Sequence, residues 1–258
     1  MRVQPPGAHR MIVILVAFSL AGCGYDEGHN ALAPRTDIRS GGAPDPTTGG
    51  TIVFPFDPAN FAAGVPNPFF PLTRGTHWSY RQQTPDGVET SEVDVTFDTK
   101  RILTVTTAVV HDQVFRNGEL SEDTFDWYAP DKDGNVWYFG EDTKEIVGGV
   151  PVSTAGSWQA GKNGAQAGII MLAHPMIGDT YLQENSPGVV GDMARVKSLN
   201  ETVTVPLNTF SGCLKTQEFT SLEPGARAFK FYAAGVGTVL EAENHKGGPV
   251  ELITFSKP

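Results

Sequence analysis

The chain has 258 residues, of which 29 are acidic and 19 basic, giving a formal net charge of −10 at pH 7. An acidic chain is a poor ligand for nucleic acid or for an anionic membrane face, because both attract clustered Lys and Arg. We therefore expect no nucleic-acid partner. Solubility at a surface, or binding of divalent cations, is compatible with this charge.

The N-terminus carries the clearest motif. Arg2 and Arg10 precede an apolar run that ends in the sequence Leu20-Ala21-Gly22-Cys23. The run is about a dozen residues, too short for a transmembrane helix of about 20 but suited to a signal h-region. The ending resembles a bacterial lipoprotein signal, in which the cysteine is lipidated and begins the mature chain. An ordinary cleaved signal is the alternative.

The lipoprotein interpretation divides the chain into three parts. Residues 1–22 are the expected signal peptide, and Cys23 is the expected lipidation site, carrying diacylglycerol and in many bacteria an N-acyl chain such as palmitate. Two or more acyl chains are enough for stable membrane anchoring. Gly24, where Asp would favour retention at the inner membrane, predicts the periplasmic face of the outer membrane in a two-membrane organism. Residues 23–50, polar and rich in Gly and Pro, read as a lipidated cysteine and a disordered tether.

Residues 51–258 are expected to form one all-β domain. Apolar residues alternate with polar ones at 93–97 and again at 103–109, and a period of two predicts antiparallel strands with one wet face. The turn signals between such runs are Pro85-Asp86-Gly87, Asn117-Gly118, Asp133-Gly134-Asn135, Gly148-Gly149, Glu223-Pro224-Gly225 and Gly247-Gly248-Pro249. We predict about ten strands in a strongly curved sheet or partly closed barrel. Few short helices are expected, one framed by Asp57 and Gly64 and another within 166–173.

A weak internal repeat has an offset of 104 residues. Its best match aligns Trp127-Tyr128-Ala129 with Phe231-Tyr232-Ala233 without a gap. Phe115 likewise aligns with Phe219, and Leu103 with Leu207. The pattern predicts two similar β meanders joined near residues 148–170, although shared β composition is a rival explanation.

The segment 126–142 is the densest in chemistry-bearing residues, and it reads as a β-hairpin with a polar turn. Asp131, Asp133 and Asn135 have the spacing of the first half of a calcium loop, with Gly134 allowing a sharp bend. The segment departs from an EF-hand because the glycine comes too early and the twelfth position holds Asp142 instead of Glu. A calcium site and a solvated turn are both open.

Four rings of the same hairpin, Trp127, Tyr128, Trp137 and Tyr138, are candidate ligand-binding residues. Because side chains alternate along a strand, large rings fall on both faces of the sheet. One face can fill the core. The other needs a cover, which could be a second sheet, a loop or an apolar ligand.

The segment Asp126-Trp127-Tyr128-Ala129, followed by the run 131–142, resembles a family of uncharacterised bacterial secreted or lipid-anchored proteins. The family also shows matches to residues 168–175 and to the ending at 232–237, so the likeness covers most of residues 66–243. It implies an envelope location and no particular activity. The ending is also similar to lipoprotein-carrier proteins with a curved antiparallel sheet, although Ala234 stands where members more often have Pro.

Catalytic signals are sparse. His174, held extended by Pro175, is a weak candidate for a general base with Asp179 or Glu184 nearby. Cys213 is expected to be a small buried residue. The predicted function is therefore that of an envelope lipoprotein, not expected to be an enzyme, which binds an apolar ligand or a protein partner on a curved sheet. A calcium-stabilised envelope module and a hydrolase-like enzyme using His174 are the alternatives.

Overall fold

The computed structural model describes residues 51–61, 64–220, 227–243 and 247–258. The predicted signal, Cys23 and the predicted tether lie outside these residues. In the described part, no helix is long and apolar enough to cross a membrane. The fold is all-β, as the alternating pattern predicts.

The described residues form one mostly antiparallel sheet of sixteen strands, in the order β1-β10-β12-β13-β14-β15-β16-β2-β3-β4-β5-β6-β9-β11, with β7 and β8 paired to β6. The hydrogen-bonded path is open, since it begins at β1 and ends at β11. The bounds are β1 Thr51–Ile52, β2 His77–Thr84, β3 Gly87–Ile102, β4 Val105–Arg116, β5 Glu119–Pro130, β6 Val136–Val147, β7 Val150–Ser153, β8 Trp158–Gln159, β9 Gln166–Met171, β10 Thr180–Leu182, β11 Glu184–Asn185, β12 Asp192–Thr204, β13 Thr209–Thr220, β14 Ala228–Ala233, β15 Gly237–Glu243 and β16 Val250–Ser256.

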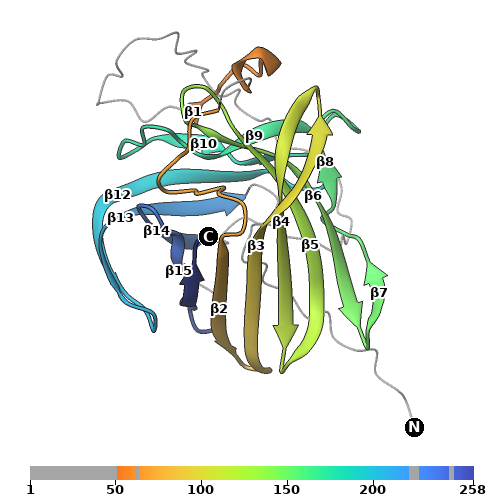
Figure 1. The fold of residues 1–258 in the computed structure, drawn as a ribbon, viewed down its shortest axis with the longest axis vertical. Coiled ribbons are helices and arrows are strands. Elements are labelled where there is room, and N and C mark those ends of the chain that lie inside the picture. The colour runs from red at the N-terminus through yellow and green to blue at the C-terminus, as the bar shows by residue number, and fades with distance from the viewer. Residues whose placement is uncertain (1–50, 62–63, 221–226, 244–246) are drawn as a thin grey trace, which may run out of the picture.

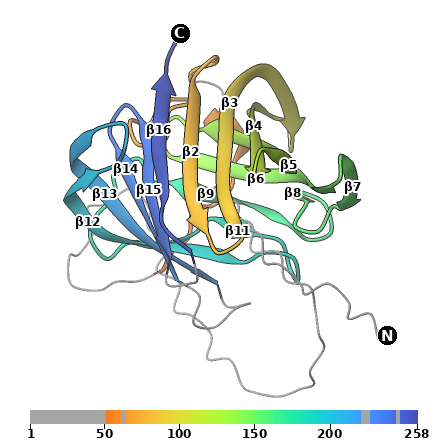
Figure 2. The same cartoon turned by 90° about the horizontal axis from the view of Figure 1, so that it is seen from below.

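The sheet consists of two meanders in the same order, as the repeat predicts. The neighbours β2-β3-β4-β5-β6 correspond to β10-β12-β13-β14-β15, and both sets are antiparallel throughout. A shift of 104 positions places both ends of β4 on the corresponding ends of β13. Strand β16 lies between β15 and β2 and joins the two halves (Figure 2).

Curvature brings the two halves face to face. Strands β2 to β5 run side by side, while β12 and β13 bend round from the other half (Figure 1). The concave faces bury a single hydrophobic cluster that draws on both meanders. Its largest fully buried rings are tyrosines on four strands, Tyr128, Tyr138, Tyr181 and Tyr232. Tyrosines rather than only aliphatic residues fill the interior, so hydroxyl groups enter the core and need polar partners.

The predicted helices have different outcomes. A 3-10 turn forms at Pro58–Phe61, and the amide of Ala59 donates to the Asp57 carboxylate at 2.9 Å, as the cap prediction requires. The predicted helix within 166–173 is wrong, because β9 occupies it. A Cβ on Gly168 would lie 2.1 Å from the carbonyl oxygen of Gln183, so this glycine allows a close backbone approach that the helix prediction ignored.

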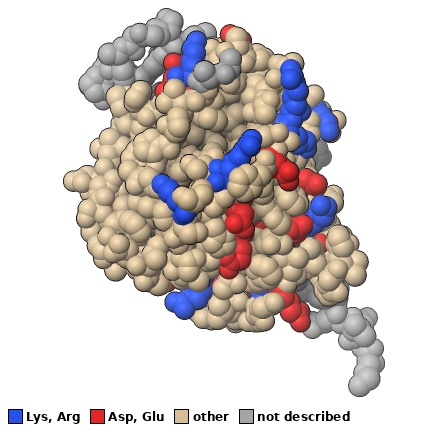
Figure 3. Space-filling view, in the orientation of Figure 1, with Lys and Arg blue, Asp and Glu red and all other residues tan. Residues whose placement is uncertain are grey.

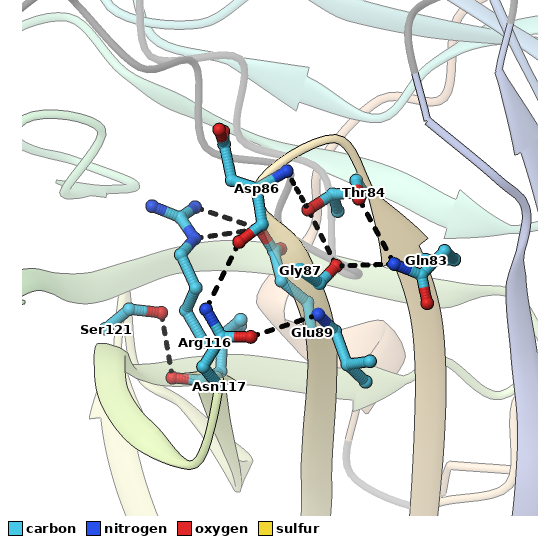
Figure 4. A network of polar contacts seen from close by, with 10 residues as sticks. Gln83, Thr84, Asp86, Gly87, Glu89, Arg116, Asn117 and Ser121 are labelled. Carbon is cyan, nitrogen blue, oxygen red and sulfur yellow. Dashed lines mark hydrogen bonds and ion pairs between the residues drawn. The ribbon is translucent and has the colours of Figure 1, made fainter.

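Polar contacts tie the hairpin β2–β3 to the hairpin β4–β5 at one end of the sheet (Figure 4). The Arg116 guanidinium forms an ion pair with the buried Glu89 at 2.9 Å. The Asn117 side chain donates to the carbonyl of Asp86 and accepts from the amide of Val88. These contacts fix the register of the first meander and thereby the positions of the inward-facing residues at its centre.

Candidate functional site

A cavity of about 50 Å³ remains inside the curve of the first meander. Its buried wall is contributed by Trp78 and Tyr80 on β2, Val93 and Val95 on β3, Val110 on β4, Tyr128 on β5 and Gly237 on β15. The half-buried residues Phe70, Pro71, Leu72 and Thr238 complete the lining and form its rim. A cavity of this size accepts a few heavy atoms, such as the end of an alkyl chain.

The rim is anchored by hydrogen bonds to the rest of the fold. The Asn67 side chain donates to the carbonyl oxygens of Gly134 at 2.8 Å and Leu172 at 3.0 Å, and accepts from the amide of Phe69. Phe70 then packs edge-on against Tyr128, with ring centroids 5.0 Å apart. The segment that contributes Phe70 to the lining is therefore held in place by hydrogen bonds and a ring contact.

Behind the cavity wall, the concave face carries buried carboxyl groups that we call the interior acid cluster: Asp112, Asp126, Glu141 and Glu184. All four have at most 1% of their surface exposed. Strand pairing places them: Val93 of the cavity wall is opposite Asp112, and Val110 is opposite Asp126, which is in turn opposite Glu141. Asp112 and Asp126 are therefore cross-strand neighbours of lining residues, although none of the four carboxyl groups lines the cavity.

Tyr138 holds the middle of the cluster together. Its hydroxyl donates to the Asp126 carboxylate at 2.6 Å and lies 3.1 Å from a Glu141 oxygen. Tyr128, which also lines the cavity, stacks on Tyr138 with a centroid distance of 4.6 Å. By contrast, neither oxygen of Asp112 and neither oxygen of Glu184 has a hydrogen-bond partner among the described residues.

Lys230 on β14 is the one buried base among the described residues. Its ammonium lies 2.9 Å from a Glu218 oxygen and 3.7 Å from a Glu241 oxygen, and these three side chains are 3–5% exposed. Glu218 also accepts from Tyr232 at 3.2 Å and from Gln183 at 3.3 Å. Shifting the sequence by 104 positions places Lys230 on Asp126, so the two meanders have a basic and an acidic residue at equivalent positions.

The pKa values follow from burial. Desolvation raises the pKa of Asp126 to about 7 and that of Glu122, on the same strand, to about 7. Desolvation also raises the pKa of Asp112, Glu141 and Glu184 well above the ordinary range, helped by the neighbouring carboxylates. For Lys230, burial alone would lower the pKa, but Glu218 and Glu241 outweigh it and raise the pKa. Among these groups, the pKa values of Asp126 and Glu122 therefore lie near neutral pH.

The cluster is separate from the surface charge. On the face drawn in Figure 3, acidic and basic side chains are interspersed over a mostly uncharged surface. The interior carboxyl groups are enclosed by the sheet and contribute no exposed acidic patch.

The four predicted ligand-binding rings separate onto the two faces. Tyr128 lines the cavity, and Tyr138 lies behind it in the acid cluster. Trp137 is covered on the other face by the chain's own Phe54, Phe56 and Phe61, with centroid distances of 5.6–6.4 Å. Trp127 is covered by Lys100, whose ammonium lies 3.1 Å from the ring centroid. A loop, one of the expected covers, therefore protects this second face.

The predicted calcium residues form a tight turn. Asp131 accepts hydrogen bonds from the backbone of Asp133 and Asn135, the Asn135 side chain and the Trp137 indole, all at 2.9 Å. Asn135 in turn accepts from the amide of Ala173 at 2.8 Å. Among the described residues, no group of three or more His, Cys, Asp or Glu side chains is arranged to hold a metal ion. Calcium binding here stays a prediction.

The predicted catalytic residues differ in their environments. His174 is exposed and is not part of the cavity lining, whereas Glu184 is fully buried in the acid cluster. Asp179 uses a carboxylate oxygen to accept from the amide of Met176 at 2.9 Å. A role for His174 as a base stays a prediction. Cys213 is fully buried, as expected of a small core residue.

Sequence reasoning missed Asp112, Glu141, Lys230, Glu218 and the inward role of Asp126. One signal was available: Asp112 stands between Val110 and Val114 at a spacing of two, on the apolar face of its strand. Lys230 has the same relation to Ala228 and Tyr232. A charge at an inward position of an alternating strand is rarely buried without a partner or a function.

Comparisons with known proteins concern the fold alone. No family model and no curated protein matches the sequence. The structure is similar to a "putative exported protein with YmcC-like fold" from Bacteroides fragilis NCTC 9343, at 15% identity and TM-score 0.41, over 75% of this chain and 99% of that one. It is also similar to a "putative lipoprotein" from Parabacteroides distasonis ATCC 8503, at 12% identity and TM-score 0.41, over 74% and 100%.

Proposed function

We propose that the protein is a lipid-anchored envelope protein that binds the end of an apolar molecule in the cavity of its curved sheet, without catalysis. The observation that carries this proposal is the cavity itself. Its wall is mainly apolar and includes Trp78, Val93, Val95 and Val110. Sites for small apolar molecules are typically concave and lined mostly by hydrophobic and aromatic side chains.

The chemistry of the wall favours an apolar occupant. The Trp78 indole donates to the carbonyl of Val236 at 2.7 Å, and the Tyr80 hydroxyl donates to the carbonyl of Thr238 at 3.0 Å. Both polar groups are therefore satisfied within the protein, and their rings present apolar surface to the cavity. Burying an alkyl end there gains about 25 cal/mol per Å² of apolar surface removed from water.

The anchor rests on the lipobox-like sequence Leu20-Ala21-Gly22-Cys23. We expect Cys23 to be acylated and the protein to reside in the cell envelope. Mass spectrometry of the N-terminal peptide of the membrane-extracted protein tests this. Diacylglycerol on Cys23 supports the anchor. A soluble mature protein that begins elsewhere contradicts it.

Binding is tested with hexan-1-ol as the probe and the full chain carrying Cys23→Ser, so that no detergent competes. The chain has four tryptophans, and Trp78 is the one in the cavity lining. In ¹⁵N–¹H NMR spectra, hexan-1-ol should shift the Trp78 indole resonance in a saturable way. The Trp137 indole, which donates to Asp131, serves as an internal control and should not move.

A matched pair of variants checks the location. Leu72→Trp adds bulk at the cavity rim and should weaken hexan-1-ol binding at least tenfold. Leu199→Trp makes the same change at an exposed site outside the cavity lining and should leave binding unchanged. Equal responses in both variants, or no saturable shift of Trp78, would overturn the proposal.

A further inference from the structure

The outer surface of the second meander carries basic and aromatic side chains together. Buried and half-buried residues alternate at 214–220 on β13 and at 228–232 on β14, so the half-buried side chains lie on the outer surface. Strands β12, β13 and β14 are hydrogen-bonded neighbours and lie side by side (Figure 2). We define the second-meander face as Arg195 and Lys197 on β12, Lys215 and Phe219 on β13, Arg227, and Phe229 and Phe231 on β14.

The cations of this face lie over its rings. The Lys215 ammonium is 4.7 Å from the ring centroid of Phe229 and 5.1 Å from that of Phe231. The Arg195 guanidinium is 5.9 Å from the ring centroid of Phe219. A cation over a ring is attracted by the ring face but keeps its full positive charge. These contacts therefore gather positive charge above an aromatic surface.

Carboxylates do not neutralise this charge. Arg195, Lys197 and Lys215 form no ion pair with a carboxylate among the described residues. The outer positions paired across β12 to β15 contain no acidic residue: they are Met193, Arg195, Ser198, Lys215, Gln217, Phe219, Phe229, Phe231, Leu240 and Ala242. An acidic residue comes next at Glu251 on β16, opposite Leu240.

The first meander has equivalent rings with different charges. A shift of 104 positions places Phe229 on Phe125, so the ring is matched. The same shift places Arg227 on Asp123, and Asp142 lies opposite Phe125 across the strand pair. Carboxylates thus accompany the ring in the first meander, whereas bases accompany it in the second. In a chain with a net charge of −10, this face is a local basic exception.

We propose that the second-meander face docks on an anionic phospholipid surface. The inference rests on the proposed function for the lipid anchor, which would hold the domain beside such a surface. As a flexible chain, the predicted tether 23–50 has a root-mean-square span of about 30 Å, so the domain can reach the headgroups. Clustered Lys and Arg are attracted to anionic headgroups, and aromatic rings suit the interfacial layer of a membrane. The total charge of the chain opposes this contact, but the basic face permits it in one orientation.

The test measures pelleting of the full chain carrying Cys23→Ser with vesicles at low salt. Because this chain cannot be acylated at Cys23, binding reports the face and not the anchor. We expect binding to vesicles of phosphatidylglycerol and phosphatidylcholine, weaker binding as salt is added, and none to phosphatidylcholine alone. The double variant Arg195→Gln with Lys215→Gln should reduce binding at least tenfold.

A matched control removes two bases from the first meander. Lys100→Gln with Lys144→Gln changes the net charge equally, at residues that lie over Trp127 and Phe125, and should leave binding nearly unchanged. Lys197→Gln, at an exposed position without a ring contact, is a second test that spares packing and should weaken binding severalfold.

Three outcomes would overturn the proposal. Absence of binding to the anionic vesicles would show that the face does not dock on lipid, and binding of soluble polyglutamate instead would assign it to an acidic protein partner. Equal losses in the two double variants would show that total charge, and not this face, decides. Equal binding to both kinds of vesicle would show that charge has no part in it. Acylation of Cys23 and hexan-1-ol binding are measured separately, so the proposed function can stand if this inference fails.

Discussion

Removing Lys230 tests whether the interior charges are as tightly balanced as the structure indicates. The substitution Lys230→Met keeps most of the length of the side chain but leaves Glu218 and Glu241 without this cation. The ammonium lies 2.9 Å from Glu218 and 3.7 Å from Glu241, and none of the three side chains is more than 5% exposed. Water cannot screen the charges left behind.

The expected cost follows from that burial. Removing one partner of a buried ion pair typically costs about 3–5 kcal/mol. For a domain of this size, each kcal/mol lowers the melting temperature by about 2–4 °C, so a fall of at least about 6 °C is expected. Lys215→Met is the matched control, because Lys215 is half-buried and lies over Phe229 and Phe231 at 4.7 and 5.1 Å. Its loss should cost about 0.5–1 kcal/mol.

Urea unfolding at pH 7 measures the loss of free energy in both variants, and thermal melts measure the fall in melting temperature. The double variant Lys230→Met with Glu218→Gln should recover part of the loss, because it removes one of the two carboxylates left behind while the new amide oxygen can still accept from Tyr232. A Lys230→Met variant no less stable than Lys215→Met would refute the reasoning. Such a result would mean that Glu218 and Glu241 do not depend on Lys230.

Three further changes have definite expected outcomes. The pKa values of Asp126 and Glu122 rise to about 7 on folding, so their stabilising contribution is fully present below about pH 4 and is lost as the pH rises through 7. The urea midpoint should therefore be higher at pH 5 than at pH 8, and Asp126→Asn should reduce that difference. An unchanged difference in Asp126→Asn would contradict the assignment. Gly140→Ala should destabilise the fold far more than Gly148→Ala in thermal melts. A Cβ at Gly140 would lie 2.2 Å from the Trp158 carbonyl oxygen, whereas one at Gly148 meets nothing within 4 Å. Equal losses would show that the positive φ of both glycines, and not the contact, determines the loss of stability. Asp131→Ala should lower the free energy of unfolding by about 2–4 kcal/mol, because it removes four hydrogen bonds. The control Asp133→Ala, at an exposed position, should leave stability nearly unchanged. A fall in melting temperature on adding a chelator to the unmutated protein would instead support the calcium prediction.

The strands were predictable where apolar and polar residues alternate, and the prediction was wrong where the register changes. Val93 and Val95 face the core as expected, but Phe97 is 75% exposed. The cause is an irregularity between Val95 and Thr99, which interrupts the pairing of β3 with β4. Inserting extra residues in one strand turns the following side chains to the other face. No sequence rule located that irregularity.

Turns were predictable from their chemistry and were missed where that chemistry is absent. Asn117-Gly118 was predicted, and both residues have the positive φ that such a turn requires. The β3–β4 turn instead uses Leu103 and Thr104, with φ of 46° and 68°, although these residues strongly disfavour that conformation. The pairing of two long strands imposes this turn, so only the tertiary structure reveals it.

The interior acid cluster could not be assembled from the sequence, because it depends on register across several strands. A shift of one residue would turn Asp112 or Asp126 to solvent, where a carboxylate is ordinary. The 104-residue repeat predicted the two meanders, but not that Asp126 and Lys230 at equivalent positions would both face inward. The curvature of the sheet, visible in Figure 1, brings these halves together.

The most direct test of the central claim is the NMR titration of the Cys23→Ser chain with hexan-1-ol, read at the four tryptophan indoles. A ligand-binding cavity predicts a saturable shift of Trp78, no shift of Trp137, and loss of the Trp78 response in Leu72→Trp. A Trp78 resonance that stays fixed at saturating hexan-1-ol would contradict the proposed function, since the wall of the cavity would then be closed to apolar molecules.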